Sequence, residues 1–153
     1  MIFEPDNNNL ELLYKTLNKN KFNNFFIFPL AISDKIAIKK MLIDDVSGRT
    51  GSIVDNINVV QKRLELNEFK NVIAIKLDDV NDLNLDDLSL VKIDVEGHEF
   101  QVIAGMINII KKYLPVIIVE TGGNNLENIK NLLFPLNYQL KKIDLEPNYI
   151  FFR

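Results

Sequence analysis

Residues 90–99, LVKIDVEGHE, decide how the rest of the chain is interpreted. Their first part is apolar and β-branched, which predicts a buried strand, and Asp94 and Glu96 stand where that strand should end. Gly97 then supplies the residue type that turns sharply at no steric cost. In open parallel α/β sheets, ligands bind outside the carboxyl ends of the strands. The two acids therefore mark a candidate site.

The stretch that follows Gly97 predicts one long helix that continues to residue 113 and ends before Pro115. Its apolar residues form two rows, the wide stripe of a helix that lies on a sheet: Phe100, Ile103, Ile107 and Ile110, and Val102, Met106, Ile109 and Tyr113. Residues 116–119, VIIV, are a continuous apolar run and predict a central parallel strand. Glu120 then repeats the pattern of an acid at a strand tip.

The rest of the chain alternates between strand and helix patterns. Asp6 is a suitable N-cap for a helix whose apolar face is Leu10, Leu13, Tyr14 and Leu17. Extended segments are predicted at 1–3, 25–32 (interrupted at Pro29), 35–43, 72–77 and 88–95, and helices at 57–64 and 126–133. Residues 44–55 predict a loop, and 138–143 with 149–152, joined by a turn at 146–148, a closing antiparallel hairpin. This order predicts a three-layer α/β fold in a single domain, residues 1–153.

Composition excludes several classes of function. The chain has 153 residues, of which 47% are hydrophobic, so it can bury a sizeable core. The net charge of −3 is spread over mixed signs, which argues against nucleic acid as a partner. The absence of cysteine excludes disulfides, thiolate nucleophiles and Cys-based zinc sites. No apolar run reaches the ~20 residues of a membrane span, and we expect a cytoplasmic protein whose oligomeric state stays open.

The run KIDVEGHE at 92–99 resembles the signature of FkbM-type methyltransferases. Further matches follow in the same order along the chain: residues 3–5 (FEP), 30–33 (LAIS), 50–52 (TGS), 77–79 (LDD), Val102, Gly105 and 115–120 (PVIIVE). The resemblance covers essentially the whole chain. It implies the class I (Rossmann-like) fold and an S-adenosylmethionine-dependent O-methyltransferase that acts on a hydroxyl of a sugar or small metabolite, without a metal.

The resemblance also implies roles for individual residues. Glu4, with Pro5 beside it, would accept hydrogen bonds from the cofactor ribose, since a carboxylate offers two acceptors to a diol. Ala31 and Ile32 would border the adenine. Asp94 would lie beneath the methyl donor and acceptor, where a carboxylate is favoured by the sulfonium charge and can orient or deprotonate a hydroxyl. Glu96 and His98 complete the catalytic candidates, and the substrate-binding candidates are Gly51, Ser52, Glu99 and Glu120. Glu96, Glu99 and Glu120 could alternatively support the residues that touch the ligands.

The chain departs from the family pattern in one respect. Family members carry an earlier strand and a glycine-rich turn, D-x-G-A-N-x-G, which cradles the methionine part of the cofactor, and residues 1–153 contain no such motif. We therefore expect an N-terminally truncated chain or a fragment, in which Ile2–Phe3 pairs weakly or directly with the strand that ends at Val95. Two alternatives stay open: a non-catalytic remnant that serves as an interaction or structural piece, and a nucleotide-binding domain unrelated to methyl transfer.

Each candidate also has a simpler interpretation. Asp94 and Glu96 could cap the next helix, Glu4 could be an exposed terminal acid, and His98 could be a surface cap. Residues 48–52 could be an ordinary turn cluster. Asp94, Glu96 and Glu120 could instead bind a hard cation, although no spacing signature supports this. The acids at 78, 79, 82, 86 and 87 predict a solvated acidic face.

Overall fold

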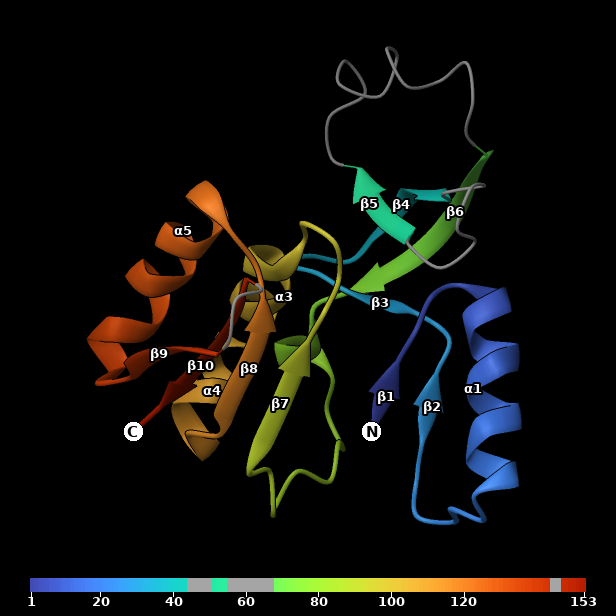
Figure 1. Cartoon of the computed structure of the whole chain (residues 1–153), viewed down its shortest axis with the longest axis horizontal. Coiled ribbons are helices and arrows are strands. Elements are labelled where there is room, and N and C mark those ends of the chain that lie inside the picture. Colours follow the sequence, from blue (N-terminus) through green and yellow to red (C-terminus); the bar gives the residue numbers. More distant parts are fainter. Residues whose placement is uncertain (44–50, 55–67, 144–146) are drawn as a thin grey trace. The chain divides into compact units, whose positions relative to one another are not determined.

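The computed structural model describes residues 1–43, 51–54, 68–143 and 147–153, which form a mixed α/β fold (Figure 1). The chain divides into two compact units. The first comprises Met1–Ile32 and Ile36–Ile75, and the second Ser33–Lys35 and Lys76–Arg153. The expected α/β class is confirmed, whereas the expectation of a single domain stays a prediction.

The first unit begins with a strand–helix–strand element. Strands β1 (Ile2–Phe3) and β2 (Ile27–Phe28) are parallel and are joined by helix α1 (Asn7–Lys19), as parallel strands require a crossover connection. The Phe3 and Phe28 rings stack with their centroids 5.0 Å apart. The predicted helix is thus confirmed, but the predicted partner of Ile2–Phe3 is wrong: the strand pairs with β2 rather than with the strand before Val95.

The other sheet of the first unit has the order β3-β6-β4-β5. Its strands are β3 (Ala31–Ile32), β4 (Ala37–Ile43), β5 (Gly51–Val54) and β6 (Glu68–Ile75). One face carries a buried cluster, onto which Ile53 packs: Ala31, Met41, Val72 and Ala74. The break at Pro29 is confirmed. The predicted loop is wrong over 51–54, which is strand β5; the predictions for 44–50, 55 and 57–64 lie outside the described residues.

The second unit contains a four-stranded sheet with the order β7-β8-β10-β9. Its strands are β7 (Leu90–Ile93), β8 (Val116–Glu120), β9 (Gln139–Ile143) and β10 (Asn148–Phe152). Strands β7 and β8 are parallel, and the C-terminal hairpin inserts β10 between β8 and β9. The central position of β8 and the closing hairpin are both confirmed, although β7 ends two residues before the predicted limit. Much of the hairpin turn lies outside the described residues.

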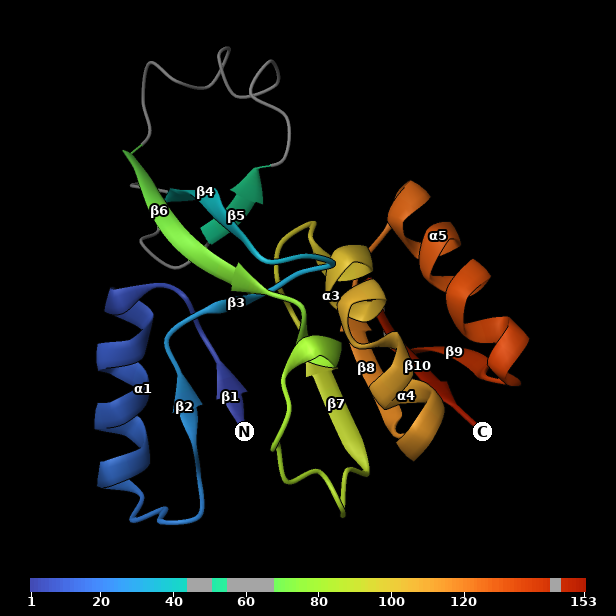
Figure 2. The ribbon, with the colours of Figure 1, turned by 180° about the vertical axis from the view of Figure 1, so that it is seen from behind.

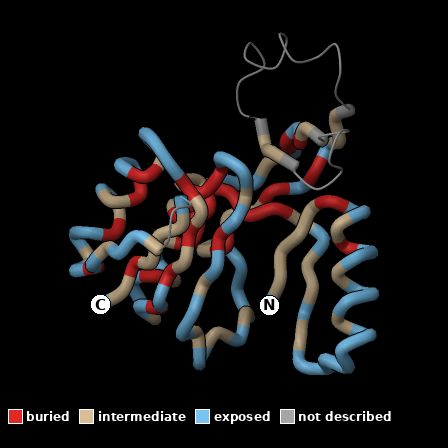
Figure 3. The backbone as a smooth tube through the Cα atoms, viewed as in Figure 1, coloured by how far each residue is buried: buried red, intermediate tan, exposed pale blue. Residues whose placement is uncertain are grey.

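Over the residues described, the second unit also contains five helical segments. They are the 3₁₀ turn η1 (Leu77–Asp79), α3 (Glu99–Gly105), α4 (Ile107–Tyr113), α5 (Gly123–Leu133) and the 3₁₀ turn η2 (Phe134–Leu136). Both ribbon views show α3 and α4 against the sheet, and α5 contacts α3 (Figures 1 and 2). Figure 3 shows in red the buried segments of the strands and helices of this unit. Within the described ranges, no helix is long and apolar enough to cross a membrane.

The single long helix predicted after Gly97 is wrong, because it breaks at Met106, whose backbone leaves the helical region (φ −127°, ψ 21°). The second piece has its own cap: the Asp78 carboxylate accepts hydrogen bonds from the Asn108 and Ile109 amides, each at 3.0 Å. The apolar periodicity therefore identified the buried face correctly, but a distant side chain decides where helix α4 begins. Asp78 is not part of a merely solvated acidic face.

Candidate active site

The turn from β7 into α3 contains the acids that the sequence analysis singled out. Asp94 directly follows β7 and is exposed, and its carboxylate lies 2.8 Å from the Lys92 ammonium. Glu96 has a φ of 51° and Gly97 a φ of 99°, so two consecutive residues are left-handed. Glycine adopts this conformation freely, whereas it costs a residue such as glutamate roughly 1–2 kcal/mol. The corner thus needs support from its surroundings.

Helix α3 begins without a conventional side-chain cap. Its N-cap residue is His98, whose side chain makes no capping hydrogen bond. The N-cap position is thus not held by Asp94 or Glu96, and a favourable effect of their charge on the helix dipole stays a prediction. The supporting carboxylate is that of Glu99, which is 2% exposed and accepts a hydrogen bond from the Gly97 amide at 2.6 Å.

The same Glu99 carboxylate reaches the neighbouring strand exit. Its second oxygen accepts hydrogen bonds from the Thr121 hydroxyl at 3.3 Å and from the Asn125 side-chain amide. Thr121 is the residue directly after β8, and Asn125 lies in the first turn of α5. One buried anion is thus satisfied by three donors from two corners, which is the arrangement that makes a buried charge tolerable.

Glu120 occupies the tip of β8, beside the tip of β7. The parallel register pairs Ile93 with Val119, so Asp94 and Glu120 each lie one residue beyond this pair. The rim of this sheet therefore carries acids from two adjacent strands, as predicted. Within the described part of the chain, no three His, Cys, Asp or Glu side chains are grouped so that they could hold a metal ion together, so the structure offers no support for a cation site formed by Asp94, Glu96 and Glu120.

His98 lies inside the second unit, with 1% of its surface exposed. Its Nε2 atom is 3.0 Å from the Ser33 hydroxyl, which itself donates to the Asp34 carboxylate at 3.1 Å. Because the single hydroxyl proton of Ser33 points to Asp34, Nε2–H is the donor in the bond to Ser33. The interpretation of His98 as a surface cap is therefore wrong, while its role as a catalytic residue stays a prediction.

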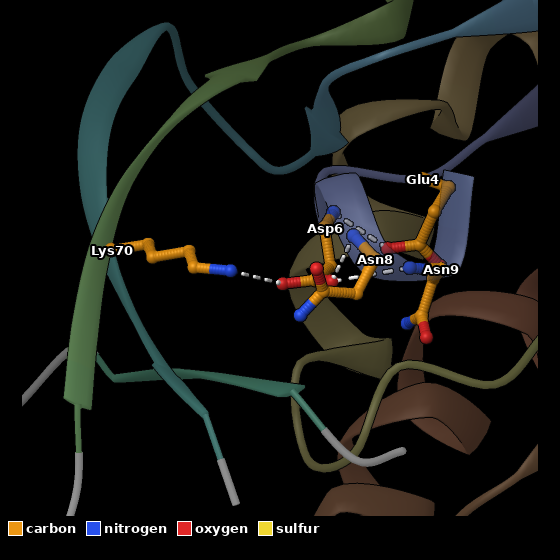
Figure 4. A network of polar contacts seen from close by, with 5 residues as sticks. All are labelled: Glu4, Asp6, Asn8, Asn9 and Lys70. Carbon is orange, nitrogen blue, oxygen red and sulfur yellow. Dashed lines mark hydrogen bonds and ion pairs between the residues drawn. The ribbon is translucent and has the colours of Figure 1, made fainter. Parts of the chain in front are cut away.

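In the first unit, Glu4 belongs to a polar network at the start of α1 (Figure 4). Its Oε1 atom accepts a hydrogen bond from the Asp6 amide at 2.7 Å, and Asp6 in turn accepts from the Asn8 and Asn9 amides. Asp6 also pairs with Lys70 of β6 at 3.2 Å. Glu4 is half-buried, and this burial raises the pKa of its carboxyl above the ordinary 4.5. It is therefore not a frayed terminal acid.

The other candidates of the first unit lie on its second sheet. Ala31 and Ile32 are buried in β3, and Ala31 already packs within the core cluster. Gly51 and Ser52 lie on β5, where they pair with Ile43 and Leu42. They are strand residues rather than members of a loop, and the remainder of the predicted substrate loop, at 48–50, lies outside the described residues.

In the second unit, Asp94, Glu96 and Glu120 thus lie at or just beyond the tips of the adjacent strands β7 and β8, and the buried Glu99 links the two strand exits. Sequence reasoning missed the residues that support them. Thr121 and Asn125 carried only the weak signal of polar residues after a strand tip. The involvement of Ser33 with His98, 65 residues away, had no local signal at all.

Comparisons with known proteins identify the family and a similar fold. The sequence model of the Methyltransferase FkbM domain matches residues 1–145. Among solved structures, the chain is similar to the methyltransferase FkbM from Methylobacillus flagellatus KT, with a TM-score of 0.64 and 16% sequence identity. That similarity covers 98% of this chain and 35% of the other, so this chain spans about a third of the length of that protein. At 16% identity the likeness concerns the fold alone. No curated protein sequence matches the chain.

Proposed function

The chain belongs to the FkbM methyltransferase family, and on this premise we propose that it takes part in transferring a methyl group from S-adenosylmethionine to a hydroxyl of a sugar or small metabolite. The observation that carries this proposal is the family match over residues 1–145, which spans every candidate residue. The placement of acids at the tips of two adjacent parallel strands supports it, because this rim is where α/β folds bind their ligands.

Asp94 is the residue best suited to the reacting groups. It forms an ion pair with Lys92 that is open to solvent: 43% of the Asp94 side chain and 62% of the Lys92 side chain are exposed. Such pairs contribute at most about 1 kcal/mol, so a ligand can replace Lys92 at little cost. The Asp94 carboxylate could then orient an acceptor hydroxyl and receive its proton, while bound S-adenosylmethionine would supply the methyl group and, with its S–C bond broken, would leave as S-adenosylhomocysteine. Most of the rate comes from the alignment of donor and acceptor.

Glu96 and Glu120 extend the same acidic rim. Their oxygens suit hydrogen bonds from the hydroxyls of a polyol, the chemistry that a sugar or small metabolite presents. His98 is less suited to this task, because its buried Nε2 atom is already engaged by Ser33. In our proposal His98 acts through the position of α3, and Asp94 is the group that touches the substrate.

The residues of the first unit fit the nucleoside part of the cofactor. Glu4 presents a half-buried carboxylate at the tip of a strand, which is the acceptor that a ribose diol requires. Pro5 follows it at the same tip, and Ile32 and Ala31 of β3 offer the apolar surface that adenine needs. When bound, S-adenosylmethionine supplies an electrophilic methyl group on a cationic sulfur, which an acid such as Asp94 favours electrostatically.

The first test is a calorimetric titration of the chain with S-adenosylhomocysteine, the product form of the cofactor, with ATP as the comparison ligand. We expect saturable binding of S-adenosylhomocysteine and no comparable response to ATP. Binding of ATP instead would favour a nucleotide-binding domain. No response to either ligand would overturn the proposal for this chain and favour the non-catalytic alternative.

The second part of the test assigns the role of Asp94. Transfer of a labelled methyl group to a panel of sugars and small alcohols is compared between the wild type, Asp94→Asn and Asp87→Asn, an exposed acid outside the rim. We expect Asp94→Asn to lower transfer about tenfold to a hundredfold, because it removes a general base but leaves a hydrogen-bonding group. Asp87→Asn should retain the wild-type rate. Equal rates in all three proteins would exclude Asp94 from the reaction.

A further inference from the structure

We propose that Glu99 is a positioning residue: its buried carboxylate fixes the left-handed corner that presents Asp94 and Glu96, and ties this corner to the exit of β8. The resemblance to the family left open whether Glu99 holds substrate or supports the residues that do. With 2% of its surface exposed and three donors around its carboxylate, it has no face left for a substrate. This inference rests on the proposed function only where it concerns ligand binding.

The corner between β7 and α3 has a strained backbone. Two successive left-handed residues, Glu96 and Gly97, turn the chain between β7 and α3. A strained corner persists only when its surroundings determine it more strongly than its own preferences do. The 2.6 Å hydrogen bond from the Gly97 amide to Glu99 Oε1 meets one of the two strained residues directly. Because its acceptor is a carboxylate, it belongs to the stronger class of hydrogen bonds.

Glu99 also links this corner to the exit of the neighbouring strand β8. Glu99 Oε2 accepts from the Thr121 hydroxyl and from the Asn125 amide, which belong to the connection between β8 and α5. The Thr121 amide in turn donates to the Pro147 carbonyl at 2.9 Å, so this connection is itself anchored. Through Glu99, the position of Glu96 is therefore fixed relative to that of Glu120. A rim that must align two reactants needs this kind of support.

The inference is tested on the full chain with Glu99→Gln, which keeps the size of the side chain but removes its charge. The matched control is Glu127→Gln, the same substitution at an exposed glutamate of α5. The first readout is the Gly97 amide resonance, which a short bond to a carboxylate shifts downfield. We expect it to move upfield, and its hydrogen exchange to accelerate about tenfold, in Glu99→Gln alone. An unchanged Gly97 resonance and exchange rate would overturn the proposal.

The second readout is the affinity of the folded variants for S-adenosylhomocysteine. We expect Glu99→Gln to bind about tenfold more weakly than the wild type and Glu127→Gln to bind equally well. Thr121→Val, which removes the hydroxyl, should weaken binding, whereas Thr121→Ser, which keeps it, should bind like the wild type. These two variants test the same link if Glu99→Gln does not fold. Wild-type affinity in folded Glu99→Gln or in Thr121→Val would mean that Glu99 is merely structural.

The two proposals fail separately. If the wild type does not bind S-adenosylhomocysteine, the proposed function fails. The Gly97 resonance still decides whether Glu99 holds the corner in that case, since this readout needs no ligand.

Discussion

Two corners of this molecule follow the same sequence pattern, an apolar strand, acids at its tip and a helix, yet they use their acids differently. At the corner between β1 and α1, Asp6 is a true N-cap and Glu4 bonds to the Asp6 amide. At the corner between β7 and α3, the N-cap residue is His98, which makes no capping bond, and Asp94 points to an exposed lysine. At the first corner, the acids accept hydrogen bonds from backbone amides at the start of their own helix, whereas at the second corner Asp94 is exposed.

The difference lies in what supports each helix. The start of helix α1 is held mainly by hydrogen bonds between residues two or three positions apart, with one long-range ion pair between Asp6 and Lys70. Helix α3 is held by contacts with distant segments: Glu99 with Thr121, His98 with Ser33, and Gly105 with the Ser33 backbone. Because α3 is supported from a distance, the Asp94 carboxylate can stay exposed at the strand tip.

The largest expected effect comes from disturbing the close approach of α3 to the Ser33 backbone. In Gly105→Ala the new Cβ would stand 1.9 Å from the Ser33 carbonyl oxygen and 2.7 Å from its carbon, so backbone must move. We expect a loss of about 3 kcal/mol in the free energy of unfolding, measured by urea denaturation. The control is Gly122→Ala, where a Cβ meets nothing within 4 Å and a loss below about 1 kcal/mol is expected. Equal losses would mean that Ser33 does not constrain α3.

A smaller effect should separate the acids of the two corners. Asp6→Ala removes the N-cap of α1 and the partner of Lys70, and we expect it to lower the free energy of unfolding by about 1–2 kcal/mol. Asp94→Ala removes only an exposed ion pair and should change it by less than about 0.5 kcal/mol. Thermal and urea unfolding measure both. A costly Asp94→Ala would show that the second corner also uses its acid for stability, and the comparison would fail.

The smallest effect concerns pH and Glu4. Burial raises the pKa of the Glu4 carboxyl in the folded chain, so the folded state holds this proton more tightly than the unfolded state does. The free energy of unfolding of the wild type relative to Glu4→Gln should therefore rise as the pH falls through the raised pKa, and level off below the ordinary value of 4.5.

Glu11 provides a control of opposite sign. Its hydrogen bond with Lys15 lowers the pKa of its carboxyl, so its contribution is present above the ordinary pKa and is lost as the pH falls through the lowered one. In urea denaturation, the wild type compared with Glu11→Gln should thus show a slope of opposite sign, and this slope should lie below pH 4.5, whereas that of Glu4 lies above it. Slopes of the same sign for Glu4 and Glu11 would contradict the burial of Glu4.

The elements predicted well were those whose signal is local. Asp6 was identified as an N-cap because a cap acts on the next two or three residues, and the run VIIV at 116–119 was identified as a central strand because its apolar character is continuous. The elements predicted poorly depend on distant partners. Asp78 caps α4 from 30 residues away, and Gly105 lies against Ser33, so no periodicity in residues 98–113 could show that the helix breaks at Met106.

By itself, the sequence determined the family, the alternation of strands and helices and the acids at two strand tips, because these follow from short-range patterns of apolar and polar residues. Only the tertiary structure decided which acid is buried and hydrogen-bonded and which is exposed. Glu99 and Asp94 are five residues apart and chemically alike, but one is enclosed by donors from another corner and the other is exposed. The physical reason is that burial and hydrogen-bond partners are properties of the whole fold, and a carboxylate becomes a support or a candidate ligand-binding group only through them.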